Sequence, residues 1–314
     1  MAIPALRCRS ADGFRGLTAL AVTATTFSAL RVMTWQHVRP ACAFTARGAG
    51  LKHGLSNRLA AQGQRLARQA GGIAAPAYTL HTYDHCPFCN RVEFLLGRVD
   101  IPYKRVVYGY GEGASPEACG GTGYSPQGGP VALTGKKMLP VLEGQDVPAA
   151  EGARGMSESL EICSYLIAKH GLVVPCDSGR GDLAAFRVEL RKVAGQLTKP
   201  RLIKMPVKDW ADARDAAYAK WKYTTKFDFD YEAAQAATPE LLMKVNEVLQ
   251  ELAPMIHGTD SMNAWGWGMD DILILPELRM LMCVKGVVFP EKVASYIDAS
   301  LKKTMLYDYS KDAC

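Results

Sequence analysis

Short alternating runs of apolar and polar residues mark the segment between residues 77 and 144. Such runs, with aromatic, Val and Thr content, are typical of β-strands. They predict three strands, AYTLHTY (77–83), YKRVVYGY (103–110) and LPVLEG (139–144). The stretch 109–129 between the second and third is dense in Gly, Ser and Pro, which predicts a long loop.

Two helices are expected among these strands. Apolar residues at helical spacing follow Pro87, a residue suited to a first helical position. SESLEICSYLIAKHG (157–171) has the same spacing, with Ser157 as a plausible N-cap and Gly171 as its stop. The resulting order of strand, helix, strand, strand and helix is that of a thioredoxin fold.

Strand patterns disappear after LVVPCDSGRGD (172–182), which has the Pro, Gly, Ser and Asp content of a linker. The chain therefore predicts a thioredoxin-like domain over 76–172 and an all-helical domain over 182–314. No internal repeat is visible. The expected helices of the second domain cover approximately 182–198, 207–222, 232–255, 270–285 and 290–304.

The first 75 residues have the composition of a targeting presequence. They hold ten Lys or Arg and one acid, Asp12, whereas residues 76–314 hold 27 basic and 30 acidic residues. The basic excess of the whole chain therefore favours targeting, and no basic patch predicts nucleic-acid binding. GLTALAVTATTFSAL (16–30) is uncharged but too short and too rich in Thr and Ser for a membrane span, so no membrane association is expected.

The destination of this presequence stays open. PACAF (40–44) resembles the cleavage region of two-part leaders that enter complex plastids, which favours a plastid. LSNRLAAQGQRLARQ can form a basic amphipathic helix, which fits a mitochondrial leader. A disordered tail without an address would leave the protein in the cytoplasm.

The chain has nine cysteines, too few for a disulfide scaffold at this length, and one close pair, Cys86 and Cys89. A structural zinc site usually needs a second pair or histidines at ligand spacing, so no metal is expected here. Thiol–disulfide chemistry is the better interpretation. Cys86 lies where a strand meets a helix, and unpaired N–H groups and the helix dipole favour its thiolate there. Cys89, one turn later, can attack a mixed disulfide on Cys86.

Two neighbours of the cysteines leave alternatives open. His85 and Arg91 are either electrostatic helpers of the thiolate or solvated residues. Phe88 either shapes the rim of the site or plugs the sheet.

Cys163 and Cys283 fall within apolar helical patterns and are expected to be buried packing residues. Cys119, in the Gly-rich loop, is expected to be a loop thiol.

CPFC (86–89) is similar to the motif of glutaredoxins, and MLPVL (138–142) looks like their segment with a cis-proline, here Pro140. SES (157–159) looks like the Glu-Ser that opens a helix in glutathione transferases. Together with a helical second domain, they resemble the bacterial two-domain glutaredoxin, which has a glutathione-transferase-like architecture. The resemblance extends over residues 77–310. It includes four short motifs in the same order, YDHCP (83–87), LRKV (190–193), DDI (270–272) and FPEKVASY (289–296).

The resemblance implies a glutathione site. Leu139 would pair its backbone with the cysteinyl unit of glutathione, beside Pro140. The helix start at Glu158 and Ser159 would hold the γ-glutamyl carboxylate, with Glu158 meeting the α-ammonium. Mere helix capping is the alternative for this segment. Candidates for the glycine carboxylate are Lys136, Lys137 and Arg91.

One departure from transferase-like folds lies in the helical domain. They often cap a core helix with Ser or Thr three residues before an Asp. Gly268 holds the cap position here and Asp271 remains. Because Gly is a tolerable N-cap, folding should survive.

The predicted function is that of a glutathione-dependent thiol–disulfide oxidoreductase, and hence a role in cell redox homeostasis. Its partners would be glutathione and glutathionylated or disulfide-bonded proteins, and a monomer is expected. A dehydroascorbate reductase or omega-like glutathione transferase is the close alternative, since those enzymes use a CPF motif followed by Arg. They need one cysteine, so Cys89 favours the first prediction. A non-catalytic interaction protein with the transferase fold is a third possibility.

Overall fold

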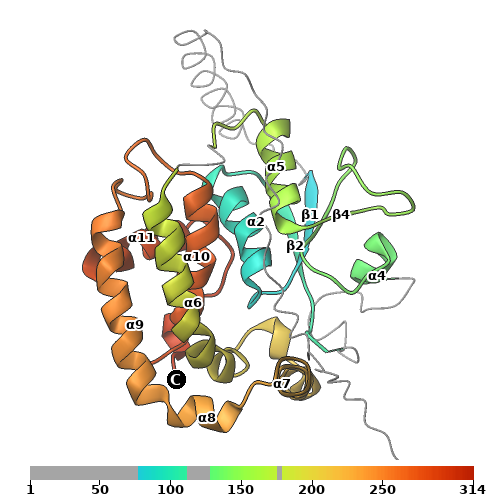
Figure 1. The fold of residues 1–314 in the computed structure, drawn as a ribbon. Helices are drawn as coiled ribbons and strands as arrows, with labels where there is room; N and C mark the ends of the chain where they lie inside the picture. Colours follow the sequence, from blue (N-terminus) through green and yellow to red (C-terminus); the bar gives the residue numbers. More distant parts are fainter. Residues whose placement is uncertain (1–76, 112–127, 175–178) are drawn as a thin grey trace, which may run out of the picture. The chain divides into compact units, whose positions relative to one another are not determined.

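The computed structural model describes residues 77–111, 128–174 and 179–314. The expected presequence and Cys119 lie outside these residues. A four-stranded sheet in the order β2-β1-β3-β4 forms the first part of the described chain. Figure 1 labels β1, β2 and β4 of this sheet, with α2 and α5 close to it. β1 and β2 are parallel, and the other two pairs of neighbours are antiparallel. The strands are β1 (Tyr78–Thr82), β2 (Tyr103–Val107), β3 (Val141–Glu143) and β4 (Met156–Ser157).

The helices of this part largely follow the sequence pattern. α2 (Pro87–Arg98) begins at Pro87 as expected, and α5 (Ser159–Lys169) packs against it. A short helix, α4 (Gly129–Thr134), and the two-residue strand β4 were not predicted. Both are too short to give a periodic signal, and α4 begins within the Gly- and Pro-rich stretch.

The expected N-cap of α5 was wrong by one residue. Ser157 belongs to β4 and pairs with Val141, so it is not free to cap a helix. The N-cap is Glu158, whose φ of 70° and ψ of 109° separate the strand from the helix. Gly171 follows the helix with a φ of 59°, a left-handed conformation that glycine adopts without steric cost, and thus ends it as predicted.

The second part of the chain is helical throughout, as predicted. The segment expected over 232–255 is two helices rather than one, because Pro239 at the start of the second cannot donate a backbone hydrogen bond within a continuous helix. Residues 207–222 hold a 3₁₀ turn, η1 (Lys208–Trp210), before the longer helix begins. The helices are α6 (Gly181–Leu202), α7 (Ala213–Phe227), α8 (Tyr231–Ala236), α9 (Thr238–Leu252), α10 (Met269–Leu281) and α11 (Glu291–Leu301), with 3₁₀ turns η2 (Ala253–Met255) and η3 (Tyr309–Asp312).

One apolar core joins the sheet to the helices. α10 packs directly against α2, and buried side chains of both parts form one cluster. Cys163 and Cys283 are fully buried within it, which confirms their prediction as packing residues. None of the helices in the described residues is long and apolar enough to span a bilayer.

The start of α10 confirms the expected cap. Gly268 is its N-cap, and the Asp271 carboxylate accepts the Gly268 N–H at 2.7 Å and the Met262 N–H at 2.8 Å. The Tyr296 hydroxyl donates to the same carboxylate at 2.7 Å. Asp271 thus replaces the missing side chain of Gly268 by satisfying buried donors itself.

Candidate active site

The two cysteines occupy the first turn of α2. Cys86 is the N-cap residue, with extended backbone angles of −79° and 119°, and Pro87 takes the first helical position. The Cys86 side chain is half-buried, whereas Cys89 is fully buried. The Tyr83 N–H donates to the Cys89 sulfur at 3.4 Å. Of the two sulfurs, Cys86 is therefore the one that a substrate can reach.

The surroundings of the two thiols separate their acidities. A hydrogen bond from Cys89, the charge of His85 and the N–H groups of Cys89 and Phe88 lower the pKa of Cys86 to about 7, against the opposing effect of burial. Burial and the neighbouring Cys86 raise the pKa of Cys89 well above its ordinary value. Near neutral pH, Cys86 is the thiol that can become a thiolate nucleophile, and Cys89 stays neutral.

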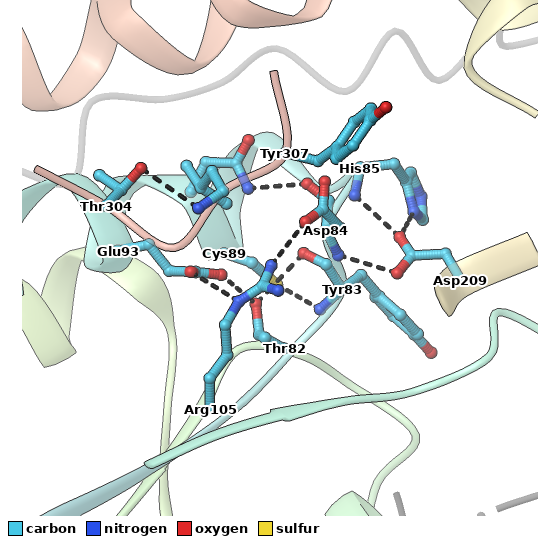
Figure 2. A network of polar contacts seen from close by, with 12 residues as sticks. Thr82, Tyr83, Asp84, His85, Cys89, Glu93, Arg105, Asp209, Thr304 and Tyr307 are labelled. Atoms are coloured by element: carbon cyan, nitrogen blue, oxygen red, sulfur yellow. Dashed lines mark hydrogen bonds and ion pairs between the residues drawn. The ribbon is translucent and has the colours of Figure 1, made fainter. Parts of the chain in front are cut away.

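The helical domain contributes a fully buried carboxylate to the segment before Cys86. Asp209, in η1, accepts the backbone N–H of Asp84 at 2.9 Å and that of His85 at 2.8 Å. The same carboxylate contacts Nδ1 of His85 at 2.5 Å (Figure 2). His85 is thus held by both its backbone and its ring, and it is 7% exposed. The alternative of a solvated His85 is wrong.

Asp84 is the centre of a second buried network, and Figure 2 shows it between His85 and Arg105. Arg105 donates to its Oδ2 at 2.7 Å, Tyr309 donates to its Oδ1 at 3.0 Å, and Arg279 forms an ion pair with it. Arg279 is fully buried and also donates to the Asp84 carbonyl and to Asn90 Oδ1, both at 2.8 Å. Burial works to raise the pKa of Asp84, but the two arginines lower it to about 2. The carboxylate is therefore charged and compensated.

Three predicted site segments meet at one end of the strands, where β1 and β4 end and β3 begins; this end is called the site edge of the sheet. The register places His81, Val141 and Ser157 side by side across β1, β3 and β4. Cys86 follows β1, the Leu139–Pro140 bond precedes β3, and α5 follows β4 at this same edge. Two strand spacings separate β1 from β4, or about 10 Å. An extended tripeptide spans about the same length.

The proline segment has the predicted conformation. The Leu139–Pro140 peptide bond is cis, and Pro140 is buried. Leu139 and Cys86 both pack against the cluster formed by Tyr83, Cys89 and Tyr110. The structure therefore places Leu139 and the Cys86 thiol against the same apolar cluster.

The Glu-Ser segment supplies a second polar feature at this edge. Ser159 is 6% exposed, and its Oγ accepts a hydrogen bond from Arg91 Nη1 at 3.3 Å. Glu158 is exposed, and its side chain does not cap α5. The first N–H groups of α5 are thus without a side-chain cap at the point where an anion could approach.

Arg91 and Phe88 differ from their simplest predictions. Arg91 is 8% exposed, so it is not a solvated neighbour, and it lies against Ser159. Phe88 is 39% exposed with the Arg91 guanidinium 4.9 Å from its ring centre, so it is a rim residue rather than a plug on the sheet. Of the lysine candidates, Lys136 is exposed, and Lys137 donates to the Tyr110 carbonyl at 3.0 Å.

Sequence reasoning missed the contribution of the helical domain to this site. An aromatic cluster lies around Cys86, and several of its members come from η1 and α7. Lys222 of α7 donates to the Tyr110 hydroxyl at 3.0 Å. The aromatic residues of the cluster are Tyr83, Tyr108, Tyr110, Trp210, Tyr218 and Tyr223. A signal was present in the many aromatics of 210–231, but the pattern alone does not say which of them face the cysteines.

Family models match both parts of the described chain. The model for the glutathione S-transferase N-terminal domain matches residues 85–169, and that for the glutaredoxin 2 C-terminal domain matches residues 182–313. These matches assign a glutathione S-transferase-type N-terminal domain and a glutaredoxin 2-type C-terminal domain to the two parts of the chain, an arrangement similar to that of glutaredoxin 2. This assignment confirms the predicted resemblance and the predicted fold class.

Individual proteins are similar to this chain to different extents. Glutaredoxin 2 of Escherichia coli K12 is 26% identical over 230 residues, which cover 72% of this chain and 95% of the relative. The crystal structure of glutaredoxin 2 from Salmonella typhimurium in complex with glutathione is 27% identical, with a TM-score of 0.62. It covers 76% of this chain and 100% of that chain. A glutathione transferase Omega 3C from Trametes versicolor is 16% identical, with a TM-score of 0.41.

Proposed function

We propose that the protein is a glutathione-dependent thiol–disulfide oxidoreductase whose nucleophile is Cys86. The main support is the pair of opposite acidities in one helical turn, with the pKa of half-buried Cys86 lowered to about 7 and that of buried Cys89 raised. A thiol with a pKa near ambient pH combines a high thiolate fraction with good nucleophilicity. Similarity to glutaredoxin 2 supports the same activity.

The first step is attack of the Cys86 thiolate on a glutathionylated protein. The Cys86 sulfur bonds to the glutathione sulfur, the protein sulfur leaves as a thiolate, and it takes a proton from solvent. A second glutathione thiolate then attacks the glutathione sulfur of the mixed disulfide. This step releases glutathione disulfide and regenerates the Cys86 thiolate.

Cys89 provides a second route when the substrate is a protein disulfide. Attack by Cys86 then gives a mixed disulfide with the protein, and Cys89 displaces the protein thiolate to form the Cys86–Cys89 disulfide. Two glutathione molecules reduce this disulfide and leave as glutathione disulfide. Because Cys89 is fully buried and its thiol hydrogen-bonds Cys86, it can reach a disulfide on Cys86 but not a free substrate.

We propose that glutathione lies along the edge between Cys86 and α5. Its cysteinyl unit would pair with the Leu139 backbone beside Pro140, and its γ-glutamyl carboxylate would lie at Ser159 and the first N–H groups of α5. The cis peptide bond at Pro140, the strand register and the uncapped start of α5 support this placement. The glutathione complex of the Salmonella relative supports the choice of ligand.

Reduction of hydroxyethyl disulfide by glutathione tests the proposal. The protein should catalyse it, and Cys86→Ser should abolish the activity. Cys89→Ser should keep reduction of a glutathionylated peptide and lose reduction of a protein disulfide. A protein that reduces dehydroascorbate but neither disulfide would instead be the alternative reductase. Retained activity in Cys86→Ser would remove Cys86 as the nucleophile.

A further inference from the structure

Arg91 is a buried cation that forms no ion pair with a carboxylate of the described residues. It is 8% exposed, Nη1 donates to Ser159 Oγ at 3.3 Å, and the Phe88 ring covers the guanidinium at 4.9 Å. Its Nε is buried and has no hydrogen-bond partner among the described residues. A buried cation is stable only where other groups compensate its charge.

The charges around Arg91 compensate it only in part. Arg187 of α6 donates to Glu277 Oε1 at 2.8 Å, and Arg191 donates to the same oxygen through Nε at 3.0 Å. Glu277 Oε1 thus serves two arginines, whereas Glu277 Oε2 is buried without a hydrogen-bond partner among the described residues. Burial first, and then the charge of Arg187, lower the pKa of Arg91, although Glu277 opposes this. Arg91, Arg187, Arg191 and Glu277 together carry a net charge of about +2, which an approaching anion would reduce.

The hydrogen bond from Arg91 leaves the Ser159 hydroxyl free to donate to an acceptor group of a ligand. Because Arg91 occupies a lone pair of Ser159 Oγ, the single hydroxyl hydrogen remains for another group. Ser159 is the first residue of α5, and the N-cap Glu158 makes no side-chain cap hydrogen bond, so the first N–H groups of the helix add donors next to Ser159. A carboxylate satisfies all of these donors, whereas an ammonium group would meet donors and positive charge.

We propose that Arg91 determines specificity for the γ-glutamyl α-carboxylate of glutathione by polarising Ser159, with Arg187 of the helical domain adding to the positive field. This inference rests on the proposed function and identifies what selects glutathione over other small thiols. Arg91 acts as a positioning residue through Ser159. Cysteinyl thiols that lack this carboxylate would approach Cys86 without the interaction.

A pair of matched thiols tests the proposal. 4-Aminobutyryl-Cys-Gly differs from glutathione by loss of the α-carboxylate alone. We expect the wild-type protein to use glutathione with a kcat/KM about tenfold or more higher, the effect of a hydrogen bond to a charged group. Arg91→Met should lower this ratio several-fold through a higher KM for glutathione, while Ser159 and the first N–H groups of α5 retain part of the preference. Arg91→Lys should restore part of it, since the positive charge remains.

The control variant is Arg98→Met on the same helix, since Arg98 pairs with Asp260 away from Ser159. It should leave the ratio unchanged. A wild-type ratio retained in Arg91→Met would overturn the inference, and so would a wild-type ratio of one. Neither result touches the proposed function, which fails separately if the wild-type protein reduces hydroxyethyl disulfide with neither thiol.

Calorimetry gives a readout that does not depend on turnover. S-Methylglutathione and its 4-aminobutyryl counterpart would be titrated into the wild-type protein and Arg91→Met. The variant should show a weaker preference for the carboxylate-bearing ligand than the wild-type protein, and equal preference in both proteins would contradict the inference. Because each protein is compared with itself, a moderate loss of stability in the variant does not mimic the expected result.

Discussion

Asp209 and His85 lie 124 residues apart in the sequence, yet the Asp209 carboxylate accepts a hydrogen bond from the backbone N–H of His85 at 2.8 Å. The same carboxylate contacts Nδ1 of the His85 imidazole. The backbone N–H of Asp84 donates to the same carboxylate at 2.9 Å. The residues that lead into Cys86 are therefore fixed by the helical domain. Local structure alone does not determine the shape of this segment.

Asp209→Ala should lower the free energy of unfolding by about 3 kcal/mol, because it leaves two buried N–H groups without an acceptor. Asp209→Asn should cost less, since its amide oxygen can still accept. Urea unfolding measures both. Lys208→Ala, which changes the exposed neighbour in η1, is the matched control and should be nearly neutral. Equal stabilities of Asp209→Ala and Lys208→Ala would contradict this role.

The ion pair between Arg279 and Asp84 predicts a second large effect. Arg279→Met should lower the free energy of unfolding by about 3–5 kcal/mol, because it leaves Asp84 buried with less compensation. Combining it with Asp84→Asn should cost less than the sum of the single changes, since the uncompensated charge is then gone. A double-mutant cycle from urea unfolding measures this coupling, and strict additivity would show that the pair is not coupled.

The low pKa of Asp84 predicts how stability depends on pH. Its pKa of about 2 in the folded protein lies below the value of the unfolded chain. The carboxylate therefore stabilises the fold above about pH 4, and this contribution is lost as the pH falls toward 2. Between pH 5 and pH 3 the loss should be about 1 kcal/mol. Urea unfolding at both pH values should show a smaller difference in Asp84→Asn than in the wild-type protein.

The sequence predicted the elements whose signal is local. The strand at Tyr78, the helix start at Pro87 and the cap at Gly268 each follow from a short stretch of residues. The cysteine pair and the cis-proline at Pro140 were likewise predicted, the latter through resemblance to a family.

The rest depends on contacts that no short stretch contains. Ser157 is a good N-cap residue, but its pairing in β4 moved the cap to Glu158. Arg279 and Asp209 lie in segments whose pattern predicts ordinary helices. Their roles arise because tertiary packing brings them to residues 84 and 85, and single-sequence periodicity carries no information on such pairs.

Ser157 and Ser159, which are separated by Glu158, allow a matched test of the proposed glutathione site. Ser159→Ala should raise the KM for glutathione about tenfold with little change in kcat, because it removes a hydrogen bond to a charged group at a distance from the reacting sulfur. Ser157→Ala should leave the KM unchanged, since Ser157 belongs to β4. Steady-state kinetics with hydroxyethyl disulfide measure both, and a similar KM in the two variants would argue that Ser159 only supports the helix.

The acidity of Cys86 predicts the pH dependence of its reactivity. The thiolate forms as the pH rises through the pKa, so the rate of alkylation by iodoacetamide should rise with pH and level off, with a midpoint at about 7. Because the hydrogen bond from Cys89 is the largest cause of this low pKa, Cys89→Ala should move the midpoint upward. Cys89→Ser keeps a donor and should move it less. Mass spectrometry of the peptide that contains Cys86 separates its alkylation from that of the exposed Cys314. A midpoint near 9 in the wild-type protein, or one that Cys89→Ala leaves unchanged, would show that the first turn of α2 does not activate this thiol.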